Sequence, residues 1–398
     1  METNHALRWC SIVFALASAA CGSATGVGAH GIKEVWYETQ VGDSRARPAV
    51  AGELVFFGTG NGRVIARNIQ TGAAIWATAV SNEAVNGSNL VAMAGVVVAP
   101  VVHEVIGLNA STGAVLWRYN PPLDTAGVAP PDTPLPGTVT DGRIDADSTT
   151  VYIPAWGASV SALDIRTGQR KWVWQAARIA SDTATTGVFR SGSMSATVYR
   201  DTVFATVWHF TNRQGGTSDA WVLALNAKTG AEYWGVKLPD AGSGTFIEAQ
   251  PRPIGNLLIV RTLSGHTYAL TRAEGQITWQ FAAVQASSST VSSAEVYSDI
   301  VYVDGGDGKL YALRGADGSK VWDSPISGAV SRDMLVTQKH IVFPIAGSLY
   351  FLDRETGREV AAIAQPHTND PLFSSAASGS NGRVFVSAAD AALCVTEP

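Results

Sequence analysis

The stretch Leu108–Asn120, "LNASTGAVLWRYN", reads as the end of a short strand, a turn with a glycine, and a second strand that carries a tryptophan. The chain repeats this unit with small changes, as RNIQTGAAIW, LDIRTGQRKW, LNAKTGAEYW, LTRAEGQITW and LRGADGSKVW. The glycine fits a residue of positive φ in a hairpin with a bulge. The Asn or Asp that opens most copies can accept hydrogen bonds from the backbone amides of the turn. The unit therefore predicts a recurring antiparallel hairpin.

The spacing of the unit predicts the architecture. Successive tryptophans of the internal copies lie between 41 and 62 residues apart. A seventh copy, LDRETGREVA, has Ala361 in the place of the tryptophan. A period near 40 residues, with several short strands per unit and no helical segment, is typical of a β-propeller blade.

The two ends of the chain complete the number of blades. Residues Lys33–Val41, KEVWYETQV, look like a fourth strand without the three strands that should precede it, and residues 372–397 supply three strands without a fourth. We expect the N-terminal strand to close the last sheet, so that no raw sheet edge is left in the ring. The sequence thus predicts an all-β fold, an eight-bladed β-propeller of four-stranded antiparallel blades, the last blade closed by the N-terminal strand.

The recurring tryptophans are interpreted as structural residues that pack between neighbouring blades. Each unit contributes one at the same position, which is the behaviour of a packing residue and not of a binding residue. The set comprises Trp36, Trp76, Trp117, Trp172, Trp234, Trp279 and Trp322.

The composition favours a large core and argues against nucleic acid and metal ions as binding partners. Hydrophobic residues make up 46% of the 398 residues and charged residues 15%, so a core is easily filled. The net charge is −5, and no block of Lys or Arg points to nucleic acid. The seven histidines are scattered without metal-ligand spacing, so no metal site is expected.

The first residues are typical of an export signal. The apolar run Trp9–Ala20 is too short to span a bilayer and leads to Cys21. We expect residues 1–21 to be a signal peptide, 22–31 a flexible tether, and 32–398 a single propeller domain. Two alternatives are open for Cys21: lipidation, which would anchor the periplasmic protein to the outer membrane, or cleavage that leaves a spare thiol.

The repeat resembles that of the quinoprotein (PQQ-type) propellers, and the resemblance covers residues 32–397. Within that superfamily the chain is most similar to the BamB family, the propeller lipoproteins of the outer-membrane β-barrel assembly machinery. The shared features are the length, eight blades with an N-terminal closing strand, a last repeat with Ala in place of tryptophan, and a signal that ends in cysteine. This resemblance implies a non-catalytic exported scaffold that binds protein partners.

The same superfamily contains enzymes. Quinoprotein alcohol dehydrogenases hold PQQ and a calcium ion in such a propeller, and resemblance to them implies a vicinal cysteine pair and metal-binding carboxylates. This chain is shorter and has no adjacent cysteines. We therefore expect no cofactor and no catalytic residues. A small-ligand or quinone-binding sensor remains the alternative function, and a PQQ-dependent dehydrogenase is disfavoured.

Topology predicts which face would bind a partner. In a four-stranded blade the TG turns share one face with the first-to-second turns, and the second-to-third loops share the opposite face with the links between blades. The longest segments, 120–137, 175–192 and 209–220, all fall on that second face. Long loops on a rigid scaffold are frequent sites of recognition, although they can also be mere decoration.

Four residues of these links are the candidate partner site. In the BamB family the link corresponding to GVFRSG, Gly187–Gly192, carries an apolar–Arg–Gly loop that docks the barrel-inserting subunit, and Phe189 and Arg190 match that loop by position. Gly187 and Ser191 depart from the pattern, which leaves the identity of the partner open. The next link adds Phe246 and Glu248. Glu248 is either a second partner contact or an ion-pair partner of Arg190.

Overall fold

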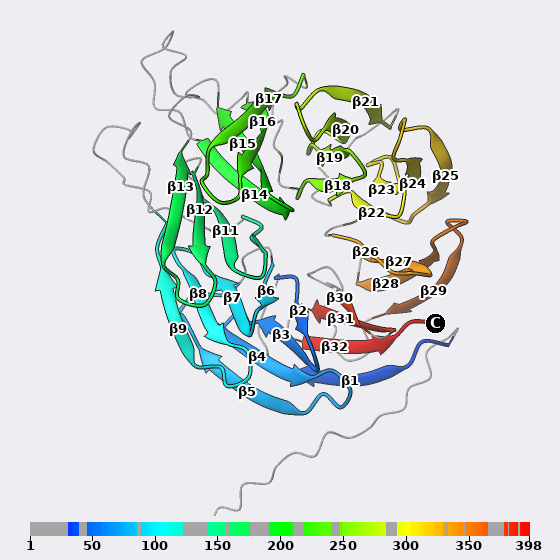
Figure 1. Ribbon diagram of the computed structural model, residues 1–398. Helices are drawn as coiled ribbons and strands as arrows, with labels where there is room; N and C mark the ends of the chain where they lie inside the picture. Colours follow the sequence, from blue (N-terminus) through cyan, green and yellow to red (C-terminus); the bar gives the residue numbers. More distant parts are fainter. Residues whose placement is uncertain are drawn as a thin grey trace, which may run out of the picture.

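The computed structural model of the protein describes residues 31–39, 46–85, 89–121, 142–155, 159–175, 191–210, 218–239, 247, 249–283, 293–328, 330, 333–345, 347–364, 378–380, 382–388 and 391–398. These residues form eight four-stranded antiparallel sheets around a central axis (Figure 1). The predicted eight-bladed β-propeller is thereby confirmed. Within the described ranges, no helix has the length and apolar character needed to cross a membrane.

The first four blades follow one another along the chain, each with its strands in sequence order from the axis outward. Blade 1 comprises β2 (Ala49–Ala51), β3 (Leu54–Gly58), β4 (Arg63–Asn68) and β5 (Ala74–Ala79). Blade 2 comprises β6 (Val91–Met93), β7 (Val96–Pro100), β8 (Val105–Asn109) and β9 (Val115–Tyr119). Blade 3 comprises β10 (Asp145–Ala146), β11 (Thr150–Ala155), β12 (Ser159–Asp164) and β13 (Arg170–Gln175). Blade 4 comprises β14 (Ser191–Tyr199), β15 (Thr202–Phe210), β16 (Ser218–Asn226) and β17 (Glu232–Lys237).

The remaining blades continue in the same order, and only the last departs from it. Blade 5 comprises β18 (Arg252–Ile254), β19 (Leu257–Arg261), β20 (His266–Thr271) and β21 (Ile277–Ala282). Blade 6 comprises β22 (Glu295–Tyr297), β23 (Ile300–Asp304), β24 (Lys309–Arg314) and β25 (Lys320–Pro325). Blade 7 comprises β26 (Leu335–Val336), β27 (His340–Ile345), β28 (Ser348–Asp353) and β29 (Glu359–Ala364). Blade 8 comprises β30 (Ser378–Ser380), β31 (Arg383–Ala388), β32 (Ala391–Thr396) and the N-terminal β1 (Glu34–Thr39).

The N-terminal strand closes the ring as predicted. β1 pairs antiparallel with β32, and Trp36 lies opposite Cys394. The two outer strands of blade 8, β32 and β1, are not consecutive in the chain, so no TG hairpin joins them and none is there for a tryptophan of blade 7 to cover. Instead, Ile32 is fully buried in a cluster with Ala361. The missing turn gives a physical reason for the missing tryptophan in the seventh copy.

The TG hairpins have the backbone that the sequence pattern predicts. The glycine of each copy has a positive φ, as Gly113 at 73° and Gly168 at 69° show. The strand pairing shifts register next to the turn. In blade 2, for example, Leu108 pairs with Val115 but Gly107 pairs with Trp117. Asn109 Oδ1 accepts hydrogen bonds from the backbone N–H groups of Ser111 at 2.9 Å and Thr112 at 3.0 Å. The turn thus satisfies its own amides.

The tryptophans of the outer strands lie between blades. Trp117 of blade 2 packs on Gly168 of blade 3, where an added Cβ would come within 2.6 Å of the indole ring. The indole Nε1–H of Trp117 also donates to the carbonyl oxygen of Ile165 at 2.9 Å. Trp76 contacts Gly113 of blade 2 in the same way and donates to Ala110 at 2.9 Å. Packing and a directional bond therefore set how consecutive blades meet.

Candidate functional site

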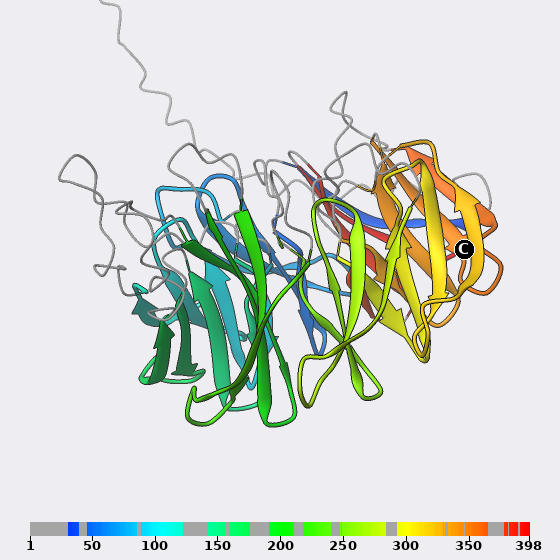
Figure 2. The ribbon, with the colours of Figure 1, turned by 90° about the horizontal axis from the view of Figure 1, so that it is seen from above.

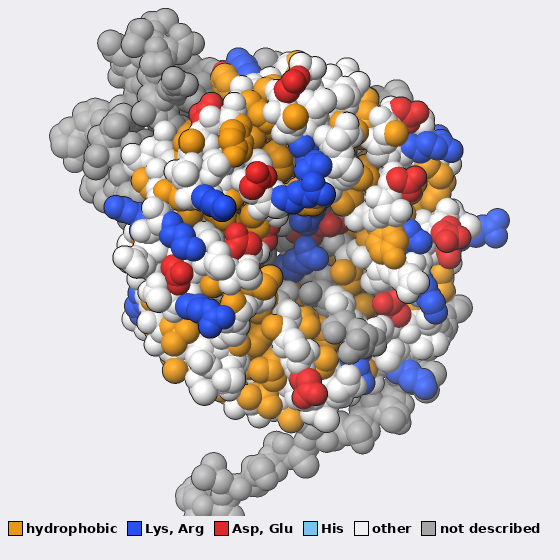
Figure 3. Space-filling view, viewed as in Figure 1, with side chains coloured by type: hydrophobic (Ala, Val, Ile, Leu, Met, Phe, Trp, Pro, Cys, Tyr) orange, Lys and Arg blue, Asp and Glu red, His pale blue; other side chains and the backbone are white. Residues whose placement is uncertain are grey.

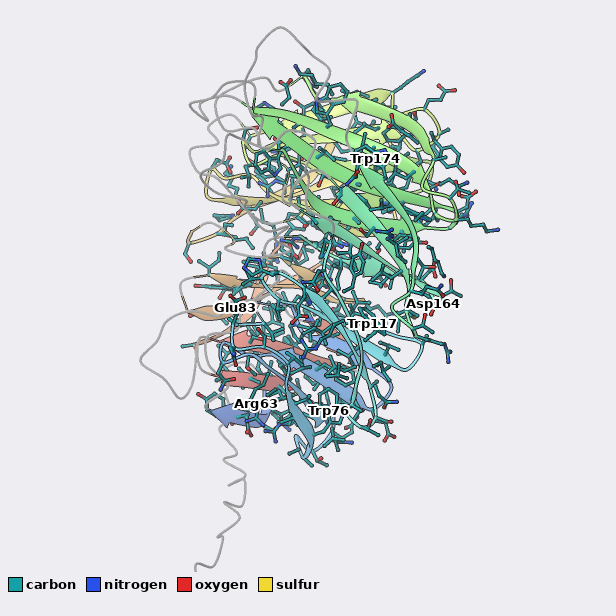
Figure 4. All side chains as sticks on the ribbon, turned by 90° about the vertical axis from the view of Figure 1, so that its left-hand side faces the viewer. Arg63, Trp76, Glu83, Trp117, Asp164 and Trp174 are labelled. Carbon is teal, nitrogen blue, oxygen red and sulfur yellow. The ribbon has the colours of Figure 1, made fainter. Side chains whose placement is uncertain are left out.

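The molecule has two unlike faces. The TG turns lie on one of them, which we call the TG-turn face, and the second-to-third loops and inter-blade links lie on the other, the loop face (Figure 2). In Figure 4, Asp164 of a TG turn is at one end of the blades, whereas Arg63 and Glu83 are at the opposite end. The connections on the TG-turn face are short and nearly uniform, which leaves the loop face as the variable surface.

The predicted partner residues fall in the part of the chain that the structure does not describe. Phe189, Arg190, Phe246 and Glu248 lie outside the described residues, and so does Cys21. Their roles stay predictions.

Two described residues show how one of these links meets the blades. Ile247 is fully buried in the core between blades 4 and 5. The carbonyl oxygen of Ala249 accepts a hydrogen bond from the buried hydroxyl of Ser195 at 2.8 Å. The blades therefore hold Ile247 and Ala249, the two residues on either side of position 248.

A ring of polar side chains surrounds the central axis. It occupies one repeated position, two residues before the innermost strand of a blade, and consists of Arg47, Asn89, Arg143, Gln250, Ser293 and Asp333. Neighbouring members are linked through backbone and side-chain hydrogen bonds. Asn89 Nδ2 donates to the carbonyl oxygen of Ile144 at 2.9 Å, and Ser293 N donates to Asp333 Oδ1 at 3.0 Å. The ring connects neighbouring blades just before the short innermost strand of each blade.

Ion pairs cross and flank the axis. Arg143 of blade 3 pairs with Asp333 of blade 7, and both side chains are more than nine-tenths buried. Blades 3 and 7 are on opposite sides of the eight-bladed ring (Figure 1). Glu295 pairs with Arg252 at 2.5 Å and lies 4.0 Å from Arg47. Figure 3 shows cationic and anionic side chains together around the central opening.

The described residues near the axis do not fit a quinone and its metal. The carboxylates of Asp333 and Glu295 are already bound to arginines. Among the described residues no group of three or more His, Cys, Asp and Glu could hold a metal ion. Cys394 is buried inside blade 8, and burial raises its thiol pKa to about 12. A buried, protonated thiol cannot take the place of an exposed cysteine pair.

The polar ring is the part of this site that the sequence reasoning missed. Each of its members stands just before a short inner strand, so a search for polar residues at that repeated offset would have found the ring. The pairing of Arg143 with Asp333 has no local signal, because the two residues belong to repeats on opposite sides of the ring.

Comparison with known families gives a match over most of the chain. Residues 22–213 and 210–339 match the family described as "Outer membrane protein assembly factor BamB". A curated protein, quinoprotein ethanol dehydrogenase from Pseudomonas aeruginosa, is 30% identical over 126 residues. That match covers 30% of this chain and only 18% of the enzyme's length.

Solved structures share the fold at low identity. BamB from Moraxella catarrhalis superposes with a TM-score of 0.64 at 16% identity, covering 92% of this chain and 98% of that one. Quinohemoprotein alcohol dehydrogenase from Comamonas testosteroni gives a TM-score of 0.70 at 13% identity, covering 94% and 78%. The computationally designed Ika8 protein gives 0.67 at 15% identity. Because a BamB, an alcohol dehydrogenase and a designed protein share this architecture, the fold alone does not select among functions.

Proposed function

The chain belongs to the family described as outer membrane protein assembly factor BamB, and from this we propose that it is a non-catalytic, exported scaffold for outer-membrane β-barrel assembly. The family match over residues 22–339 carries the proposal. The paired charges at the axis support it, since the carboxylates there are engaged in holding blades together. No cofactor forms part of this proposal.

The proposed working surface is the loop face around blades 3 to 5. Phe189, Arg190, Phe246 and Glu248 would supply aromatic and charged contacts to a protein partner, the barrel-inserting subunit of the assembly machinery. Aromatic residues and arginine are frequent hot spots of protein interfaces. If Cys21 is acylated as in a lipoprotein, the lipid would hold this scaffold at the membrane, because two or more acyl chains give stable attachment.

Replacing Phe189 and Arg190 by alanine tests the proposal. Loss of an aromatic anchor and a charge-assisted bond should cost on the order of 2 kcal/mol or more, roughly thirty-fold in affinity. We expect Phe189→Ala/Arg190→Ala to abolish co-purification with the barrel-inserting subunit and to leave the melting temperature near wild type.

Arg166→Ala, an equivalent change in a TG turn, is the control and should leave binding intact. Equal effects of the two variants would contradict the proposed surface.

The alternative of a quinone-binding propeller is favoured by the segment that matches the ethanol dehydrogenase. Dye-linked dehydrogenase activity on addition of PQQ would establish that alternative and overturn the scaffold.

A further inference from the structure

A second repeated position lies between blades, two residues after the tryptophan on each outer strand. Five of the eight interfaces have a large apolar side chain at this position: Tyr119, Trp174, Val236, Phe281 and Ile363. Tyr119 and Phe281 show that the side chain at this position can pack toward the third strand of the following blade. Phe281 of blade 5, for example, lies on Tyr311 of blade 6 with ring centroids 5.0 Å apart, and Tyr311 is only 8% exposed. The side chain at this position closes the gap between two blades.

Two of the other three interfaces are closed by polar contacts. Thr78 of blade 1 donates its hydroxyl to the carbonyl oxygen of Gly113 in blade 2 at 2.8 Å. Glu38 of blade 8 is ion-paired with Arg67 of blade 1. At these two positions a short or charged residue still reaches a partner across the interface.

The interface between blades 6 and 7 is different. Ser324 occupies the position, and its hydroxyl forms no hydrogen bond within the described part of the chain. It faces Tyr350, the counterpart of Tyr311 by strand register. Where Tyr311 is covered by the ring of Phe281, Tyr350 stacks within its own blade on Phe343, at 5.9 Å and 11°, and only its hydroxyl end is in contact with Ser327. Among the described residues, no side chain takes the place that Phe281 fills one interface earlier.

This space is a groove of about 480 Å³, which we call the blade 6–7 groove. Its lining is polar and apolar in equal measure, and the apolar part includes Ile326 from blade 6 and Ile345 and Leu352 from blade 7. Ser327 Oγ and Tyr350 Oη, 3.2 Å apart, belong to the polar part. Such a lining suits a group with an apolar body and a polar or charged end.

The chain itself indicates what fits the groove. Equivalent spaces are filled by Tyr119, Trp174 and Phe281, so the spacing of two blades accommodates an aromatic ring. The exposed Glu359 also lines the groove, and among the described residues it forms no ion pair. A carboxylate in the lining favours a positive charge on whatever enters. A polypeptide can bring both groups together, with an aromatic side chain in the groove and a nearby cationic side chain beside Glu359.

We propose that the blade 6–7 groove binds an aromatic side chain of an extended polypeptide segment that carries a lysine or arginine close to the aromatic residue. This proposal stands on the comparison of blades and does not depend on the partner proposed for the loop face near Phe189.

Ser324→Phe tests it, because the new ring fills the groove as Phe281 fills its own interface. The matched control is Ser324→Ala, which removes the hydroxyl and leaves the groove open. The probe is a short fluorescein-labelled peptide with a central Phe and a Lys two residues away, followed by fluorescence anisotropy. We expect wild type and Ser324→Ala to bind it equally and Ser324→Phe to bind at least tenfold more weakly. Glu359→Gln should weaken binding less than Ser324→Phe does.

The proposal is overturned if Ser324→Phe binds the peptide like wild type, or if a peptide with Ala in place of Phe binds equally well. It also fails if free p-cresol binds as tightly as the peptide. If Ser324→Phe does not fold, the proposal is tested by hydrogen exchange of the wild-type protein with and without the peptide. Protection by the peptide must then appear in residues 324–327 and 348–352, and protection elsewhere contradicts the site. The Phe189→Ala/Arg190→Ala variant should keep full peptide binding, which separates this proposal from the proposed function.

Discussion

Gly168 shows how a single residue can be constrained from two sides. Its φ of 69° is a conformation that residues with a Cβ adopt at a cost. Its Cα also lies under the indole ring of Trp117, where an added Cβ would come within 2.6 Å of the ring. The glycine in the TG unit is thus required by the turn and by the neighbouring blade at once.

Gly168→Ala should therefore be more destabilising than an ordinary substitution of a turn glycine. We expect a loss of about 3 kcal/mol, from the left-handed backbone and from overpacking against the ring. The control is Gly52→Ala, at a φ of 57° with no atom within 4 Å of the added Cβ, which should cost about 1 kcal/mol. Urea denaturation of both variants measures the difference, and equal losses would show that contact with Trp117 contributes nothing.

At the scale of the element, β1 is a strand whose partners are supplied by the opposite end of the chain. It covers the outer edge of β32, and Trp36 in it is 7% exposed. The ring of Trp36 lies on Gly72 of blade 1 and beside Phe57 at 6.0 Å. β1 therefore joins blade 8 to blade 1 in addition to completing blade 8.

Deleting residues 32–41 should destabilise the whole ring and not only blade 8. Loss of the buried tryptophan alone costs about 3–5 kcal/mol, and the exposed edge of β32 adds to this. We expect a large fall in the melting temperature in one cooperative transition, followed by circular dichroism. Deleting residues 22–30 is the control and should leave melting unchanged. A truncated chain that melts like the intact protein would refute the closure argument.

The elements that could be predicted from the sequence are those with a local signature. The TG hairpin and the closing strand each have one, because the glycine indicates the turn conformation and the repeated tryptophan marks the outer strand of a blade. The Arg143–Asp333 pair and the blade 6–7 groove could not be predicted in this way. They depend on which side chains two distant repeats bring together, and Ser324 is informative only beside Phe281 at the same register. The partner role of Phe189 and Arg190 rests on resemblance and stays a prediction.

On the scale of the whole molecule, Arg143 and Asp333 connect opposite sides of the ring. Both are buried, so each charge depends on the other for compensation. Asp333 has a second role, because its Oδ1 accepts the backbone N–H of Ser293. The pair thus combines a direct link between blades 3 and 7 with a hydrogen bond between the inner strands of blades 6 and 7.

Asp333→Asn should be strongly destabilising because it keeps the hydrogen bond from Ser293 N but removes the negative charge that lies against the buried Arg143. We expect a loss of about 3 kcal/mol in the free energy of unfolding. Arg143→Gln should have a similar effect for the converse reason. The double variant Arg143→Gln/Asp333→Asn removes both charges and should recover most of the loss, since two amides carry no charge to compensate and can hydrogen-bond to each other. Urea denaturation of the four proteins gives the coupling energy between the two residues. Additive losses would mean that the two charges do not depend on each other, and the connection across the axis would then lie in the backbone hydrogen bonds of the polar ring.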